Sequence, residues 1–480
     1  MNLKEDINHN VRAIKAFIGK SDDVIFFSFK SCGKDAVAVY VDSITDKDML
    51  GLEVISPLKN AEEFSTVKSL AKKITLANIT LKNNIKDCVT AILNGSTVIF
   101  FDEKQQAIAA DLKKFEMRAI SEAPTGLAIR GPRNAFTETI KTNLSLIRRY
   151  LKSEELTITS MEIGTYTKTS VSLVYISGIA GKDLVDKVND KLKSIVIDGV
   201  PDSSYIAKFL SEKKHSLFKQ VGATERPDVV IERLLEGRVA VIVDGSPFVL
   251  TLPYLIIEDF QSAEDYYISS YRANFSRIIR VVALFIAVVL PAYFVSTQIF
   301  HMQLIPLNFL LTIINAIKGI PLTPSMEMFF TMLIFEILNE TSVRMPKYVG
   351  MALGIVGALV LGETVVQAGI VSTPAVLIMA LSGICIYTVP EITESTSILR
   401  ILFLLLAGSI GIYGILVISA IMICYLVTSD NYGVPYTAPY SPLIANDLQD
   451  SFLMKNVVDM TKRPESIGSP NKIRRKRKNA

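Results

Sequence analysis

The feature that most constrains this chain is an apolar segment without a charged residue, at positions 281–300. A helix of about 20 residues, rising 1.5 Å per residue, spans the ~30 Å hydrocarbon core of a bilayer. Arg272, Arg277 and Arg280 come directly before it, and basic residues accumulate on the cytoplasmic side of membrane spans. The segment therefore predicts a membrane span that begins in the cytoplasm.

Charged residues crowd before Arg280 and after Ser429, and the stretch between is nearly free of them. Residues 277–430 are therefore predicted to form an all-α, multi-span membrane domain. Its other spans are clearest at 397–427 and at 348–389, which is long enough for two crossings, whereas the proline-flanked region 304–346 favours re-entrant or interfacial helices. Basic residues at both ends favour an even number of crossings, four in our preferred interpretation and six in the alternative.

Residues 431–480 are predicted to be a cytoplasmic basic tail that can face anionic lipids, because Arg474–Lys478 is a basic cluster. The cluster has no accompanying aromatic pattern or motif of the kind that binds nucleic acid, so no nucleic-acid partner is expected. The N-terminus lacks the apolar core of a signal peptide, so the soluble part is expected to stay in the cytoplasm. Both termini are expected to face the cytoplasm, because basic residues precede the first span and follow the last.

The soluble part is predicted to contain two similar α/β subdomains, at residues 21–120 and 154–276. An N-terminal helix at 1–20 precedes the first, and a connector helix at 121–153 separates the two. Short motifs recur at constant offsets in both. The set Val39, Tyr40, Val41, Lys47, Asp48 and Met49 matches Val174, Tyr175, Ile176, Lys182, Asp183 and Leu184, and the set Ile92, Leu93, Gly95 and Asp102 matches Leu234, Leu235, Gly237 and Asp244. An internal duplication explains the matches, and convergent use of common strand and turn residues is the alternative.

The connector has an apolar face formed by Phe136, Ile140, Leu144 and Ile147, which is typical of an amphipathic helix. Its basic residues could bind a partner or lipid headgroups, although a solvated helix face is the favoured interpretation. These residues are Arg130, Arg133, Lys141, Arg148 and Arg149.

No catalytic constellation is found along the chain. Residues 178–183 resemble a phosphate-binding loop, but the glycines are too close together and Asp183 replaces the hydroxyl residue. The scattered cysteines show no zinc-site or disulfide spacing. The chain is therefore predicted not to be an enzyme and to need no cofactor or metal, and Asp244-Gly245 between apolar runs indicates a hairpin turn.

Ionisable residues at membrane depth are the candidates for function, because a charge there is costly unless it is paired or lies along a watery path. The candidate pore or gating residues are Glu336, Glu340, Arg344, Glu363 and Gln367. On a continuous helix Glu340 and Arg344 would be one turn apart and could pair. Interfacial anchoring with internal ion pairing and a role in lining a pore both remain open.

Glycines spaced for close helix packing lie in the same region. These candidate packing residues are Gly350, Gly354, Gly357 and Gly362. They indicate helix association, either within one chain or between chains.

Several long stretches resemble the A subunits of bacterial spore germinant receptors. They include GPRNAFTETIKTNLSLIRR, RPDVVIERLLEGRVAVIVDGSPFVLTLPYLIIEDFQSAEDYY, GIVGALVLGETVVQAGIVS and YGVPYTAPYSPLIANDLQD, and the resemblance covers residues 125–464. The resemblance implies a multi-pass protein of the spore inner membrane that acts with a polytopic, nutrient-binding B subunit and a lipoprotein C subunit. It also implies a homo-oligomer that serves as a nutrient-gated ion channel.

This chain departs from the family pattern near the candidate residues. Met332 stands where a second acidic residue is common, and Thr341 and Ser342 stand where Ala-Gly is common. Because one acidic residue of the family pattern is missing, the polarity of a pore lined by this region is left open by the sequence.

Two other functions compete with the receptor subunit. One is the related accessory A-like protein associated with dipicolinate release, which gene neighbourhood would distinguish. The other is a membrane-anchored enzyme or a secondary transporter, although no active-site set supports an enzyme and a transporter should show paired, interrupted spans in its two halves.

Overall fold

The computed structural model describes residues 2–61, 66–114, 130–344 and 363–474. The chain forms two compact units. The first contains residues 1–214, 220–254 and 458–480, and the second contains residues 215–219 and 255–457. Each unit is considered by itself below.

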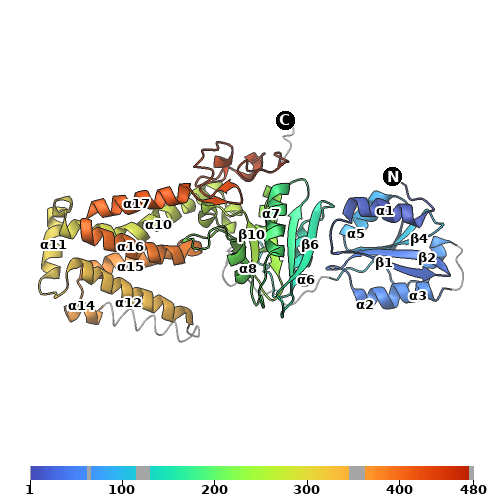
Figure 1. The fold of residues 1–480 in the computed structure, drawn as a ribbon, viewed down its shortest axis with the longest axis horizontal. Coiled ribbons are helices and arrows are strands. Elements are labelled where there is room, and N and C mark those ends of the chain that lie inside the picture. The colour runs from blue at the N-terminus through green and yellow to red at the C-terminus, as the bar shows by residue number, and fades with distance from the viewer. Residues whose placement is uncertain (1, 62–65, 115–129, 345–362, 475–480) are drawn as a thin grey trace. The chain divides into compact units, whose positions relative to one another are not determined.

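The first unit begins with a five-stranded sheet that is covered on both faces. Its elements are α1 (Ile7–Ile18), β1 (Val24–Ser31), β2 (Lys34–Val41), α2 (Lys47–Met49), η1 (Leu50–Ile55), α3 (Ser56–Lys59), α4 (Val67–Ala71), β3 (Ile79–Lys82), α5 (Ile85–Leu93), β4 (Ser96–Phe101) and β5 (Ala107–Asp111). Alternate side chains of β2 point to opposite faces, so Val39 and Val41 pack under α1 and α5 while Ala38 and Tyr40 pack against η1 and α3. Figure 1 shows α1 and α5 on one face of this sheet and α2 and α3 on the other.

A second five-stranded sheet follows with the same arrangement. Its elements are α6 (Ile140–Tyr150), β6 (Leu156–Ile163), β7 (Thr169–Ile176), α7 (Lys182–Lys193), α8 (Ser203–Leu210), β8 (Gly222–Thr224), α9 (Pro227–Glu236), β9 (Val239–Val243) and β10 (Val249–Leu252). The strand orders are β1-β2-β4-β5-β3 and β6-β7-β9-β10-β8. Every pair in both sheets is antiparallel. Each described sheet therefore combines two hairpins with antiparallel pairs of non-consecutive strands, and has no pair of parallel strands.

The repeated motifs occupy equivalent places in the two subdomains. The Val-Tyr-Val/Ile triplets lie at the ends of β2 and β7, and the Lys-Asp pairs begin α2 and α7. Gly95 follows α5 and Gly237 follows α9, each with the positive φ that favours glycine. Asp244 and Gly245 form the turn between β9 and β10, as the sequence predicts. The shared strand order supports an internal duplication.

Alanine at the two equivalent glycines is expected to destabilise the subdomains unequally. The left-handed backbone alone costs about 1–2 kcal/mol at either position. A Cβ at Gly237 would lie 2.9 Å from the Ile179 carbonyl oxygen, whereas at Gly95 the close neighbour is the flexible Lys113 side chain. Gly237→Ala should therefore lower the unfolding free energy more than Gly95→Ala, as measured by urea-dependent hydrogen exchange of α9 and α5. Equal losses would contradict this interpretation of the contacts.

The helices predicted to lie beside the subdomains are instead part of their cores. Ile7, Ile14 and Ile18 of α1 are buried under the first sheet, and Leu144 and Ile147 of α6 are buried under the second. The predicted connector helix at 121–153 is thus the first helix of the second subdomain, and it begins at Ile140 with Phe136 in the preceding loop. Burial of its apolar face against its own sheet is the physical reason.

Arg148 of α6 is buried and does not belong to a solvated face, which corrects the favoured interpretation of its sequence. Its guanidinium makes a two-fold contact with Asp23, at 2.9 Å from Nε and 2.7 Å from Nη2, and also donates to the Ser21 hydroxyl. Ser21 and Asp23 precede β1, so this ion pair joins the two subdomains. Bidentate arginine–carboxylate pairs combine geometric specificity with strong hydrogen bonds.

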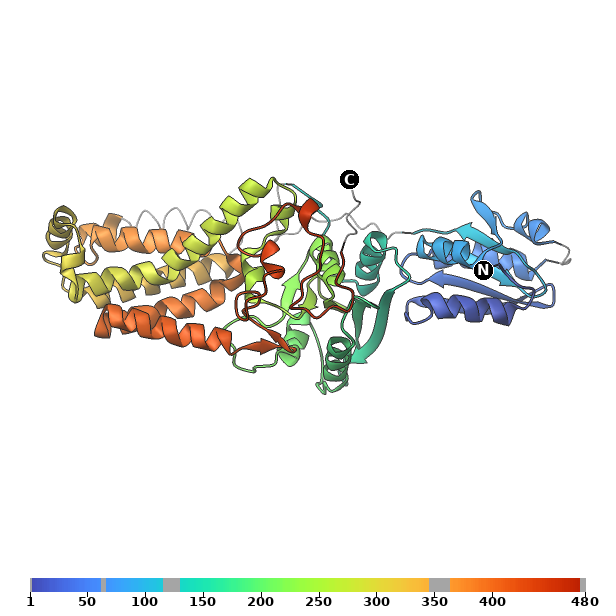
Figure 2. The ribbon, with the colours of Figure 1, turned by 90° about the horizontal axis from the view of Figure 1, so that it is seen from above.

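The second unit is a group of helices. They are α10 (Ser270–Ile299), α11 (Leu307–Ile317), α12 (Pro324–Arg344), α14 (Val365–Gln367), α15 (Thr373–Ile386), α16 (Thr393–Ile410) and α17 (Ile412–Val427). Figures 1 and 2 show α10, α15, α16 and α17 running side by side. Phe294 and Val295 of α10, Met379 of α15 and Leu404 of α16 belong to one core cluster, which also includes Met332 of α12.

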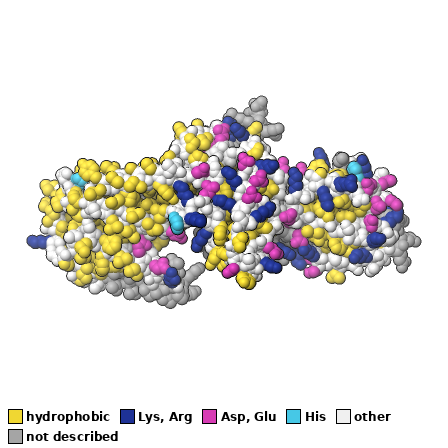
Figure 3. Space-filling view, in the orientation of Figure 1, with side chains coloured by type: hydrophobic (Ala, Val, Ile, Leu, Met, Phe, Trp, Pro, Cys, Tyr) yellow, Lys and Arg dark blue, Asp and Glu magenta, His cyan; other side chains and the backbone are white. Residues whose placement is uncertain are grey.

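Two helices in the described residues are long and apolar enough to cross a membrane. They are Ser270–Ile299 and Pro390–Ile410, and three shorter apolar helices accompany them at Leu307–Ile317, Thr373–Ile386 and Ile412–Val427. The predicted span region 397–427 is divided between α16 and α17, because Gly411 adopts a φ of +68°. Apolar side chains dominate the visible surface of these helices (Figure 3).

The C-terminal region is more structured than the predicted tail at 431–480. Residues 431–457 belong to the second unit and include the stacked rings of Tyr440 and Phe452. Residues 458–474 pack on the first unit, where Arg463 donates to the Leu235 carbonyl and Ser469 to the Ile179 carbonyl. Hydrogen bonds to these backbone carbonyls hold the segment in place. Of the basic cluster, only Arg474 is among the described residues.

Candidate functional site

A buried ion pair joins α12 to α16 inside the helical unit. Nη1 of Arg400 lies 3.3 Å from Oε1 of Glu336, and the Ser397 hydroxyl donates to Oε2 at 3.2 Å. Arg400 is only 1% exposed. Its Nε atom is buried and has no hydrogen-bond partner in the described part of the chain. The carboxylate of Glu336 is therefore the main compensation for a charge buried among apolar helices.

Arg400 was not identified by the sequence reasoning, which considered mainly acidic residues. The available signal was its position as the only basic residue within the apolar run 397–427. A lone charge at such a position requires a partner, and Glu336 was one of the candidate acids without an assigned partner.

The other candidate residues lie on exposed surfaces. Arg344 and Glu340 form the expected pair one helical turn apart, with Nη2 at 2.5 Å from Oε1 and side chains that are 77% and 65% exposed. Gln367 donates to Glu363 at 3.3 Å. Among the described residues, no hydrogen bond or ion pair joins Glu336 to any of these four. The structure therefore separates a half-buried acid, which is paired with a buried arginine, from two exposed polar pairs.

Glu327 is a fully buried acid at the first turn of α12. Its Oε1 atom accepts a hydrogen bond from the backbone N–H of Ser372 at 2.5 Å, directly before α15. A carboxylate near the first turn of a helix is favoured by the helix dipole. Glu327 thus fixes the start of α15 against α12. The predicted packing residues Gly350, Gly354, Gly357 and Gly362 lie outside the described residues.

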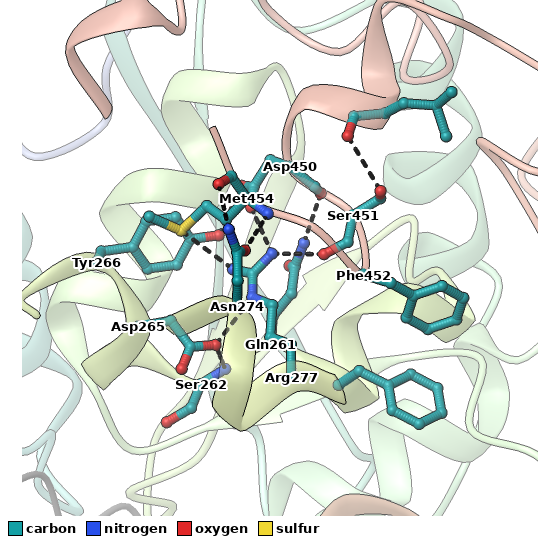
Figure 4. A network of polar contacts seen from close by, with 12 residues as sticks. Gln261, Ser262, Asp265, Tyr266, Asn274, Arg277, Asp450, Ser451, Phe452 and Met454 are labelled. Carbon is teal, nitrogen blue, oxygen red and sulfur yellow. Dashed lines mark hydrogen bonds and ion pairs between the residues drawn. The ribbon is translucent and has the colours of Figure 1, made fainter. Parts of the chain in front are cut away.

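A second polar network lies where α10 begins (Figure 4). Arg277 is fully buried, with Nε at 3.0 Å from Asp265 and Nη1 at 2.9 Å from Asp450. Nη1 also donates to the Ser451 carbonyl at 2.5 Å, and the Tyr266 hydroxyl donates to Asp450 at 2.7 Å. The network connects the loop before α10, the helix itself and the C-terminal region.

Arg280 completes this network from the next turn of α10. It contacts both oxygens of Asp265, at 2.7 and 2.9 Å. Asn274 adds a two-way contact with the backbone of Met454. Arg277 and Arg280 were predicted only to mark the cytoplasmic side of the span. The structure shows that Arg277, together with Asn274, holds residues 450–454 against α10. Arg280 holds Asp265 and the Phe260 carbonyl, and Arg272 is the exposed member of the three.

No group of His, Cys, Asp and Glu side chains in the described residues has the arrangement of a metal site. The described polar contacts are an ion pair between α12 and α16 and a network that anchors the C-terminal region to α10. Contacts of this kind fix the positions of helices, and breaking them would allow the helices to move.

Comparisons with known proteins identify the family. A family model described as "Bacillus/Clostridium GerA spore germination protein" matches residues 12–466. Spore germination protein KA of Bacillus subtilis is 35% identical over 98% of this chain and 88% of its own length. Spore germination protein GerLA of Bacillus cereus is 33% identical over 97% of this chain and 96% of its own.

A solved structure also matches, namely the N-terminal domain of the A subunit of the Bacillus megaterium spore germinant receptor GerK3. It aligns with 53% of this chain and 98% of that chain, at 30% identity and a TM-score of 0.42. Because the family match extends over nearly the whole sequence and relatives above 30% identity cover almost all of it, this chain belongs to the GerA family of spore germination proteins.

Proposed function

We propose that this protein is the A subunit of a spore germinant receptor and forms an oligomeric, nutrient-gated ion channel. In this proposal a B subunit binds the nutrient, a lipoprotein C subunit completes the receptor, and the A subunit releases ions across the spore inner membrane. The family supports the role in germination. The protein performs no catalysis of its own and uses no cofactor.

One observation carries the channel proposal. Glu363 is exposed on an apolar helical unit, and among the described contacts its side chain has only the neutral Gln367 as a partner, whereas Glu340, which is 65% exposed, pairs with Arg344. Exposed charges at membrane depth require water or a partner. A symmetric assembly would arrange one such carboxylate from each copy around an axis, where a ring of acids attracts cations.

The multi-pass topology is part of the same proposal. The two long apolar helices support crossing of the bilayer, and the shorter ones supply the remaining crossings or re-entrant segments. An even number of crossings places both termini in the cytoplasm, as the basic residues on each side of the helical unit indicate. Cysteine labelling of the C-terminal region from outside only would contradict this topology.

Glu363→Gln is expected to slow nutrient-triggered release of potassium from spores, or to change the cation preference. The substitution removes the charge and keeps the shape, so the amount of protein should remain normal. Glu391→Gln is the matched control, because Glu391 is an exposed acid of the same unit that pairs with Lys219. Unchanged release with Glu363→Gln combined with Glu340→Gln would place the pore elsewhere. Glu336→Gln is a less direct test, because Glu336 holds Arg400.

A further inference from the structure

Helix α10 is longer than a bilayer crossing requires. It contains 30 residues, or about 45 Å at 1.5 Å per residue, whereas the hydrocarbon core is about 30 Å thick. The part before Val281 carries Arg272, Arg277 and Arg280 and therefore lies outside the hydrocarbon core. The helix thus extends from the membrane into the surrounding medium.

Helix α10 has two different faces from its start into the membrane part. One face is buried within the unit and includes Ala273 and Arg277 before Val281, and Ala283 and Ala287 after it. The opposite face is apolar and open. It comprises Tyr271, Phe275, Ile278, Val282 and Phe285, which are 91%, 55%, 49%, 50% and 65% exposed. We call these five residues the α10 stripe.

The bilayer cannot cover the whole α10 stripe. Tyr271 is ten positions before Val281 and Phe275 is six, so they lie about 15 Å and 9 Å from the edge of the hydrocarbon core along the helix. The headgroup layer on each side is only about 5–8 Å thick. The first part of the stripe therefore needs a protein surface to remove its apolar side chains from water.

The spacing of the α10 stripe indicates another helix as that surface. Successive members are four, three, four and three residues apart. This repeat of 3.5 residues keeps one seam facing a partner helix along its whole length, as in a coiled coil. The spacing does not change between the projecting part and the membrane part, so the partner helix must also cross the membrane surface.

We propose that the α10 stripe binds the α10 stripe of a second copy of this chain, in parallel. Identical membrane helices have the same orientation and the same depth, so their 3.5-residue repeats come into register without further adjustment. In a parallel pair Asn274, whose amide also contacts Met454, lies opposite Ile279 of the second copy, and Val281 lies opposite Ile286, so neither of these two flanking pairs brings like charges together. This inference rests on the oligomer of the proposed function and not on ion conduction.

Disulfide cross-linking of the full chain in phosphatidylglycerol–phosphatidylethanolamine vesicles tests the α10 stripe. Phe275→Cys and Ile278→Cys are each expected to yield covalent dimers under mild oxidation. The background carries serine at Cys32, Cys385 and Cys424, whereas Cys88 stays because its thiol is buried. Burial raises the pKa of Cys88 to about 12, which keeps it protonated and unreactive.

Two matched controls distinguish cross-linking at a specific contact from cross-linking by random encounters between chains in the vesicle. Ser276→Cys is one residue from Phe275 but turned by about 100° around the helix, and Val427→Cys is an exposed residue at the end of another apolar helix. Neither should form dimers at the rate of Phe275→Cys. Equal cross-linking at all four positions would overturn the proposal.

A single tryptophan distinguishes failure of the α10 stripe from failure of the oligomer. The chain contains no tryptophan, so Phe275→Trp gives a signal without background. We expect loss of acrylamide quenching relative to Tyr166→Trp, which marks an exposed hairpin tip. Full quenching would reject the contact through the α10 stripe but would not reject the oligomer.

The mass of the extracted protein allows the same distinction. If Phe275→Cys and Ile278→Cys form no dimers while the extracted protein still has an oligomeric mass, the stripe contact is rejected and the oligomer is retained. A monomeric mass together with absent dimers would reject both.

Discussion

Glu336→Met is expected to destabilise the helical unit more than Arg400→Met, and the double substitution should recover most of the loss. Removing one partner of a buried ion pair costs about 3–5 kcal/mol, whereas replacing both with apolar residues of similar size is often neutral. Glu336→Met leaves the almost fully buried Arg400 without a counter-charge. Arg400→Met leaves Glu336, which is 26% exposed and can retain contact with water.

The measurement is a double-mutant cycle on the unfolding free energy of the purified chain in detergent micelles. The exposed pair provides the control, because Glu340→Met and Arg344→Met should each change stability by less than about 1 kcal/mol. Additive losses from Glu336→Met and Arg400→Met would show that the two side chains are not coupled. The cycle therefore tests the contact and not merely the presence of charge.

The pairing of Glu336 with Arg400 could not be predicted from sequence for a simple reason. The two residues are 64 positions apart, and an apolar run gives no indication of which helix lies opposite which. Local pairs are different, because Glu340 and Arg344 are neighbours on any continuous helix. Sequence reasoning therefore found the local pair and missed the one that connects two helices.

The soluble part shows the same distinction. The repeated motifs predicted two similar subdomains, because strand alternation and turn glycines leave local patterns. The place of α6 could not be predicted in this way. An amphipathic helix has the same periodicity whether it connects two subdomains or forms the core of one, so only the three-dimensional contacts of Leu144 and Ile147 decide.

The basic residues before the first span carried information of two kinds. Their number predicted the side of the membrane on which the span begins, a prediction based on composition alone. Their individual partners depend on Asp265 and Asp450, and Asp450 is 173 positions from Arg277. A buried arginine and an exposed one cannot be distinguished by counting charges.

Arg277→Met is expected to release the C-terminal segment from α10, while Arg272→Met is not. Loss of Arg277 removes the ion pair to Asp450 and the hydrogen bond to the Ser451 carbonyl, and leaves the Asp450 carboxylate with only Tyr266 among the described contacts. Breaking a buried pair of this kind costs about 3–5 kcal/mol. Exposed Arg272 contacts only the ring of Phe275 among the described contacts, so its loss should cost less than about 1 kcal/mol.

Limited trypsin digestion of the membrane-embedded chain measures the release. Lys455 follows Met454 directly and is exposed, but cleavage there requires the surrounding backbone to open locally. Arg277→Met should accelerate cleavage after Lys455, because residues 450–454 are no longer held. Both substitutions remove one positive charge from the same end of the same helix, so an effect on membrane orientation would appear in both. Faster cleavage in Arg277→Met alone therefore identifies the buried contact as the cause, and equal rates in the two variants would show that Arg277 serves only as a flanking charge.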